Sequence, residues 1–254
     1  MIYDYPQYYE VAFSFRDIRA EASFLKACIN RFGRTKSRNI LEIGCGPAPH
    51  AGELASFGYH FIGLDINRNM LDYATYKWRE LEPRPDFVEA DMVSFELTEK
   101  VDFAYVMLGS LYTRSKQDLV NHLDSMSRAL QPGGLYFLDW CVQFGDPRRH
   151  AEHNSFRFSR DDIEVESRFN ISLIDRTDQT YEEVWTLDVN DHGRQRELTM
   201  TERNRALLPE EFLSLINDRH DLELAGWWRS WDFDSPIRDG ESIERPVALL
   251  RKLD

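Results

Sequence analysis

The chain has 254 residues, of which 42% are hydrophobic and 13% aromatic, so it can bury a sizeable core. That length predicts one large domain or two small ones. Its 31 basic and 44 acidic residues give a formal net charge of −13. Such a charge repels phosphate backbones and anionic lipid surfaces, so we expect neither a nucleic acid nor a membrane as partner.

The cysteines and histidines do not indicate a metal site. Cys28, Cys45 and Cys141 are widely spaced and form no CxxC pair, which argues against a disulfide framework or a zinc site. The seven histidines, which include His150 and His153, are scattered without a ligand spacing. The first residues lack the basic and apolar regions of a signal peptide, and no apolar run approaches 18 residues. We therefore predict a cytoplasmic protein with no metal.

Strands and helices alternate along residues 39–141. Short apolar runs predict strands at Asn39–Ile43 and at 61–64, 87–90, 101–108 and 135–140. Segments with helical period lie at about 18–32, before the first strand, and at about 50–57, 67–79 and 115–130, between later strands. This alternation predicts an α/β fold with a doubly wound, Rossmann-like parallel sheet.

The pattern changes after residue 150. Residues 162–206 alternate between apolar and polar with turn chemistry between the runs, which predicts a three-stranded antiparallel meander. A helix follows at Pro209, and 222–233 and 247–251 are candidates for the last two strands. We find no linker, so we expect a single domain over 1–254 with residues 151–206 inserted in it as an antiparallel lid.

A glycine loop follows the first predicted strand. The order strand, Gly44-Cys45-Gly46, helix is typical of a nucleotide or nucleoside site, because glycine lets the backbone approach the ligand. An ordinary strand-to-helix turn would give the same pattern. Asp65 comes 19 residues after Gly46, where an acidic side chain can accept hydrogen bonds from both ribose hydroxyls. Glu42 stands inside the apolar strand, where a carboxylate is costly unless it has a partner.

Four motifs together give a family resemblance. They are Leu41-Glu42-Ile43-Gly44-Cys45-Gly46, Gly63-Leu64-Asp65-Ile66, Ala90-Asp91-Met92 and Leu130-Gln131-Pro132-Gly133-Gly134. With them, residues 38–141 resemble the class I S-adenosylmethionine-dependent methyltransferases of the small-molecule type. The resemblance implies a seven-stranded sheet whose last strand is antiparallel.

The same resemblance implies how S-adenosyl-L-methionine would be held. Gly44 and Gly46 would pack on its methionine part, Asp65 would hold the ribose, Ile66 and Met92 would enclose the adenine, and Asp91 would accept from the adenine amino group. The predicted cofactor-binding set is Glu42, Gly44, Cys45, Gly46, Asp65, Ile66, Asp91, Met92 and Met107.

Residues outside these motifs are candidates for an acceptor pocket. The segment Met107–Tyr112 follows the fourth predicted strand, whose carboxyl end borders the ligand crevice of such a sheet. The predicted substrate-binding set is Tyr8, Tyr9, Tyr112, Trp140, Trp185 and Arg203. Taken alone, each of these side chains is more often a packing residue.

We therefore predict a methyltransferase that uses S-adenosyl-L-methionine and a small-molecule acceptor, methylated at nitrogen or oxygen. No residue stands out as a catalytic base, and the oligomeric state is not indicated. Two alternatives stay open. A nicotinamide-dependent oxidoreductase would use the same glycine loop, although Pro49 replaces its third glycine and no Tyr-x-x-x-Lys pair is present. A cofactor-binding protein without catalysis would need only the binding residues.

Overall fold

The computed structural model describes residues 1–254 except 35, 149–154, 239–242 and 244. Its larger sheet has seven strands in the order β10-β11-β5-β4-β1-β2-β3. All pairs are parallel except those of the last strand, β11, which runs antiparallel to β5 and β10. The strands are β1 (Asn39–Ile43), β2 (His60–Asp65), β3 (Asp86–Glu89), β4 (Val101–Val106), β5 (Leu130–Asp139), β10 (Leu222–Trp228) and β11 (Val247–Lys252). The predicted sheet and its antiparallel last strand are confirmed.

Helices cover both faces of this sheet, which makes its central strands apolar throughout. In β4, Phe103 and Tyr105 pack in one core and Ala104 and Val106 in the other. The first core contains side chains of α2 (Ile18–Phe32), α3 (Ala51–Ser56) and α4 (Arg68–Lys77), and the second those of α5 (Lys116–Ala129) and α7 (Pro209–Asn217). No helix in the described part of the chain is long and apolar enough to cross a membrane.

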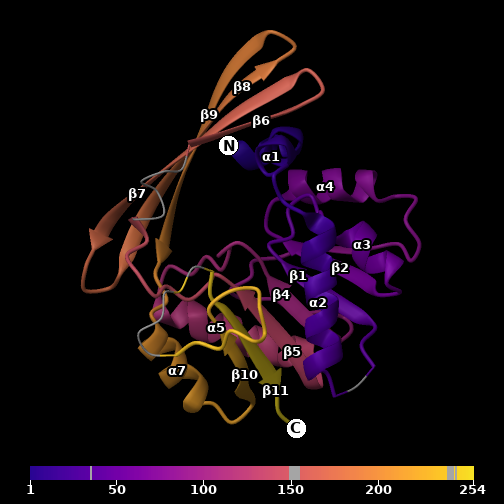
Figure 1. The fold of residues 1–254 in the computed structure, drawn as a ribbon, viewed down its shortest axis with the longest axis vertical. Coiled ribbons are helices and arrows are strands. Elements are labelled where there is room, and N and C mark those ends of the chain that lie inside the picture. The colour runs from indigo at the N-terminus through magenta and orange to yellow at the C-terminus, as the bar shows by residue number, and fades with distance from the viewer. Residues whose placement is uncertain (35, 149–154, 239–242, 244) are drawn as a thin grey trace.

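A second, antiparallel sheet rises from one edge of the core, as Figure 1 shows. This insert sheet consists of β6 (Ser155–Arg160), β7 (Ile163–Asp175), β8 (Thr180–Asp191) and β9 (Arg194–Arg205). It has four strands where the sequence predicts three, because β6 carries only two apolar side chains, Phe156 and Phe158, and gives a weak signal. Residues 151–154, the start of the predicted lid, and the histidines at 150 and 153 lie outside the described residues.

The insert sheet leaves and rejoins the core at one place. Val142 and Leu207 form an isolated parallel bridge, and the Gln143 backbone N–H donates to the Leu207 carbonyl at 2.8 Å. The two chain segments that flank the insert sheet are therefore neighbours.

The N-terminal segment packs on the insert sheet. It forms a short 3₁₀ helix η1 (Ile2–Asp4) and helix α1 (Pro6–Ala12), neither of which the sequence analysis predicts. Pro6 begins α1, a position where its missing N–H costs nothing. A separate core joins Ile2, Tyr8 and Val11 of this segment to the buried face of the insert sheet, which includes Trp185 and Leu187.

Candidate functional site

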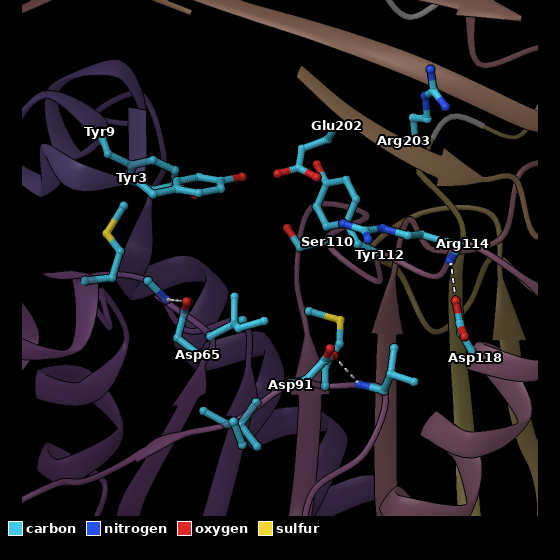
Figure 2. Close-up of a pocket in the computed structure, with 18 residues that line it drawn as sticks. Tyr3, Tyr9, Asp65, Asp91, Ser110, Tyr112, Arg114, Asp118, Glu202 and Arg203 are labelled. Atoms are coloured by element: carbon cyan, nitrogen blue, oxygen red, sulfur yellow. Dashed lines mark hydrogen bonds between the residues drawn. The ribbon is translucent and has the colours of Figure 1, made fainter. Parts of the chain in front are cut away.

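A cavity of about 560 Å³ lies at the carboxyl ends of β1, β2 and β3, between the large sheet and the insert sheet (Figure 2). Open α/β sheets bind ligands at this edge. The cavity is bordered by three parts of the chain that are distant in sequence: the N-terminal segment, the core loops and β9. Its lining residues are Tyr3, Tyr9, Gly44, Gly46, Leu64, Asp65, Ile66, Met70, Ala90, Asp91, Met92, Val93, Ser110, Tyr112, Arg114, Asp118, Glu202 and Arg203.

The glycine loop forms one wall of the cavity. Gly44 has φ +64° and Gly46 φ +50°, a region that side chains with a Cβ rarely adopt. A Cβ on Gly44 would lie 3.6 Å from Met92 Cε, and one on Gly46 would lie 4.0 Å from Met70 Sδ. The two glycines thus let the backbone turn sharply and also keep the wall free of side chains where a ligand would approach.

Asp65, at the end of β2, fixes this loop. Its Oδ2 accepts a hydrogen bond from the Gly46 N–H at 2.7 Å, and its Oδ1 accepts one from the Asn67 N–H at 2.8 Å. Burial raises the pKa of Asp65, while these backbone N–H groups oppose that shift. Each carboxylate oxygen keeps a second lone pair, so the side chain can hold the loop and still accept from a pair of ligand hydroxyls.

An apolar slot adjoins Asp65. Ile66 is 66% exposed although it is a large apolar residue, and it lines the cavity together with the half-buried Met92. Asp91 accepts a hydrogen bond from the Val93 N–H through Oδ1 at 2.8 Å, which leaves Oδ2 available. An exposed apolar side chain beside a free carboxylate oxygen suits a flat heterocycle that carries an amino group.

Three residues of the predicted cofactor set lie behind the cavity instead of lining it. Glu42 is buried, and its Oε1 lies 3.2 Å from Nδ1 of the buried His50. Its Oε2 has no hydrogen-bond partner among the described residues. Cys45 is 2% exposed and packs under the loop against β2, and Met107 is 5% exposed at the end of β4. Their assignment as cofactor ligands stays a prediction.

Glu42 belongs to a buried polar cluster that connects Arg16 and helix α2 to the residues on either side of the glycine loop. The His50 ring also contacts Glu21 Oε2 through Nε2 at 2.9 Å, and Arg16 pairs with the same Glu21 oxygen at 2.6 Å. Burial by itself would raise the pKa of Glu21, but hydrogen bonds from His50 and Arg16 lower it to about 2. Glu42 and Glu21 likewise raise the pKa of His50 against the effect of burial. The two carboxylates, which contact opposite nitrogens of the His50 ring, thus favour its protonated form.

The predicted acceptor residues divide into two groups. Tyr9, Tyr112 and Arg203 line the cavity. Tyr8, Trp140 and Trp185 do not. The Tyr8 hydroxyl donates to Asp191 Oδ2 at 2.7 Å within the insert core, and Trp140, which has φ +59°, is held at the end of β5 by the Pro246 carbonyl.

Trp185 supports the cavity from behind. Its ring is 4% exposed, and its Nε1–H donates to Ser167 Oγ at 2.7 Å. The Trp185 ring meets the rings of Tyr3 and Tyr9 edge-on, with centroids 6.2 and 5.7 Å away. Trp185 therefore fixes the position of two tyrosines that do line the cavity, and burial raises the pKa of Tyr9 to about 12.

Sequence reasoning missed several lining residues, of which Tyr3, Arg114, Asp118 and Glu202 carry polar groups. Glu202 had a detectable signal: it is two residues from Met200, so strand alternation places both side chains on one face of β9. Met200 is buried, and Glu202 continues that buried face toward the cavity.

Comparisons with known proteins agree with this geometry. Residues 40–134 match the family model for a methyltransferase domain. The matched segment includes the glycine loop, Asp65 and Asp91. A Geobacillus sp. (strain WCH70) protein whose name assigns it to the methyltransferases is 26% identical to this chain over 118 residues, which are 46% of this chain and 48% of that protein. The chain thus spans about half the length of the curated relatives it matches, 48% and 41% for two of them.

The similarity in fold extends further along the chain than the similarity in sequence. A S-adenosylmethionine-dependent methyltransferase from Clostridium acetobutylicum ATCC 824 has TM-score 0.79 at 16% identity, over 97% of this chain and 96% of that one. CalS10, an amino pentose methyltransferase from Micromonospora echinaspora, has TM-score 0.73 at 18% identity, over 96% of each chain. Such coverage includes the insert sheet.

The structures named above are those of S-adenosylmethionine-dependent or S-adenosylmethionine-bound proteins, and the residues of the cavity fit this cofactor. The bare backbone at Gly44 and Gly46 leaves room beside the loop, Asp65 offers acceptors for two hydroxyls, and Ile66 with Asp91 suits an adenine face and edge. A nicotinamide site is disfavoured by the same loop, in which Pro49 stands where the third glycine would be.

Proposed function

We propose that this protein transfers a methyl group from S-adenosyl-L-methionine to a small-molecule acceptor, at a nitrogen or an oxygen atom. The observation that carries the proposal is the division of one cavity into two chemically different ends. One end is built by the glycine loop, Asp65 and Ile66, and the other by tyrosines and β9. The name of the structural neighbour CalS10, an amino pentose methyltransferase, supports an acceptor of small size.

When bound, S-adenosyl-L-methionine supplies a methyl group that its sulfonium already makes electrophilic. The protein's task is then to orient, and orientation of two reactants supplies roughly 7–11 kcal/mol of the barrier. We assign Asp65 to the ribose hydroxyls, Ile66 and Met92 to the adenine faces, and Asp91 to the adenine amino group. Tyr3 and Tyr9, packed on Trp185, form an aromatic wall of the cavity.

Calorimetry on the purified chain tests the donor half of the proposal. We expect S-adenosyl-L-methionine and S-adenosylhomocysteine to bind and NAD not to bind. Binding of NAD in place of S-adenosyl-L-methionine would favour an oxidoreductase.

The second half is tested by incubating the protein and S-adenosyl-L-methionine with a metabolite extract from which macromolecules have been removed. We expect S-adenosylhomocysteine to accumulate faster than without extract. Donor binding with no S-adenosylhomocysteine in any extract would favour a protein that only binds the cofactor.

A further inference from the structure

The buried face of the insert sheet ends in two opposed carboxylates. Along β8, Leu187 and Trp185 are buried on this face. Glu183 lies two residues before Trp185, so its side chain is on the same face. Along β9, Glu202 lies two residues after Met200, so these two side chains also share a face. The register pairs Trp185 with Met200 and Glu183 directly with Glu202. An apolar face therefore changes to a pair of acidic side chains at the place where it meets the cavity.

Nothing in the described structure neutralises this pair. Glu183 and Glu202 form no ion pair with any described residue, although like charges directly opposite on neighbouring strands are destabilising. Arg203 lines the cavity, but its Nε donates to Glu182 at 3.3 Å, on the outward face of the sheet. Arg114, the other arginine of the cavity, makes no ion pair with either carboxylate. Burial raises the pKa of Glu183; the Tyr112 hydroxyl at 3.4 Å opposes this shift, and Glu202 adds to it.

Hydroxyl groups face the pair, and the Arg114 side chain extends beside Tyr112 in Figure 2. Figure 2 shows the Glu202 carboxylate facing the Tyr3 and Tyr9 side chains across the cavity, with Ser110 and Tyr112 beside it. Neither the Tyr3 nor the Tyr9 hydroxyl makes a hydrogen bond to another described residue. The described residues contain no group of three or more His, Cys, Asp or Glu side chains able to hold a metal ion. Two carboxylates and free hydroxyl oxygens instead suit a small organic cation with several N–H donors.

We propose that the Glu183–Glu202 pair selects an acceptor that arrives as a protonated amine, with Glu202 holding its ammonium group and taking one proton from it. This inference rests on the proposed methyl transfer, because it places the acceptor at the end of the cavity opposite the glycine loop. It assigns nitrogen, not oxygen, as the methylated atom.

The proton step balances within the site. One N–H bond of the ammonium breaks as an O–H bond forms on Glu202, so the nitrogen becomes neutral and the carboxylate becomes a carboxylic acid. The lone pair released on nitrogen then forms the bond to the methyl carbon while the carbon–sulfur bond breaks and its electrons stay on sulfur. The Tyr112 hydroxyl, which donates a hydrogen bond to Glu183, keeps the Glu183 carboxylate in place beside that of Glu202.

Matched probes test the selection without knowledge of the natural acceptor. The protein is saturated with S-adenosylhomocysteine and titrated at pH 7.5 with two pairs of probes: cyclohexylamine against cyclohexanol, and glucosamine against glucose. In the wild type we expect the amine of at least one pair to bind at least tenfold more tightly than its alcohol. Glu202→Gln should reduce the preference to less than threefold, Glu183→Gln should weaken it, and Glu202→Asp should keep part of it.

The control is Glu197→Gln, on the same strand but on its outward face, where the side chain is 67% exposed and does not line the cavity. It should keep the wild-type preference. Unchanged affinity for S-adenosylhomocysteine shows that each variant is folded. Equal binding of amine and alcohol by the wild type in both pairs, or an undiminished preference in Glu202→Gln, overturns this inference alone. Failure of the wild type to bind S-adenosylhomocysteine overturns the proposed function and this inference with it.

Discussion

Replacing Asp65 with alanine should weaken binding of S-adenosylhomocysteine by about 10- to 150-fold. The carboxylate would accept from the two ribose hydroxyls, and a hydrogen bond to a charged group contributes about 1.5–3 kcal/mol. With about 1.4 kcal/mol for each tenfold change in affinity, that range gives the stated factors. This range counts the contact with the ribose as a single hydrogen-bonding interaction. The other lone pairs of Asp65 already accept hydrogen bonds from the Gly46 and Asn67 N–H groups at 2.7 and 2.8 Å.

The same substitution should lower the free energy of unfolding by about 1–3 kcal/mol, because the Gly46 N–H loses its partner in a buried place. Asp65→Asn keeps one acceptor oxygen and should lie between alanine and the wild type in both measurements. Calorimetry measures the affinity for S-adenosylhomocysteine, and urea titration measures the free energy of unfolding. Asp72→Ala is the control, since Asp72 pairs with Arg68 on the exposed side of α4 and does not line the cavity. A folded Asp65→Ala variant that binds within twofold of the wild type would refute the assignment.

Three further predictions follow from single side chains. Gly44→Val places a branched side chain on backbone at φ +64° within reach of Met92; it should abolish S-adenosylhomocysteine binding while circular dichroism stays native, and normal binding would show that the cofactor lies elsewhere. Trp185→Ala removes a buried ring behind Tyr3 and should cost about 3–5 kcal/mol in urea unfolding; a loss below 1 kcal/mol would contradict this packing role. Burial lowers the pKa of His122 to about 4, so the unfolded chain takes up a proton first as the pH falls below 6.5. The free energy of unfolding should therefore drop by up to about 3 kcal/mol between pH 6.5 and 4, and His122→Gln should flatten that part of the curve; an unchanged slope would exclude His122 as its source.

The core of the fold could be predicted because its signals are local. Strand β1 has the bounds that its apolar run predicts, since Asn39 begins it, Gly44 follows it, and the four residues between them are buried. The first turn of α5 could also be predicted, because Ser115 caps the helix by accepting a hydrogen bond from the Asp118 N–H. Glycines, caps and apolar period act within a few residues, so they are visible without the tertiary structure.

The acceptor end could not be predicted to the same extent, because long-range packing decides it. Helix α1 has no apolar stripe long enough to stand alone, and its Tyr8 is held by Asp191, 183 residues later. Alternation shows that Glu202 shares a face with Met200, but it does not show which face turns toward the cavity. That orientation depends on how the insert sheet meets the N-terminal segment, a contact between elements that neither segment encodes by itself.

The meeting of Val142 and Leu207 at the root of the insert sheet has an evolutionary consequence. Because the insertion enters and leaves the core between neighbouring residues, a gene can lengthen, shorten or exchange this stretch without any strand of the large sheet changing its partner. The methyltransferase domain match ends at residue 134, before this stretch begins. With the roles proposed above, a change of acceptor would need changes in only one contiguous block of codons, separate from the codons of the glycine loop.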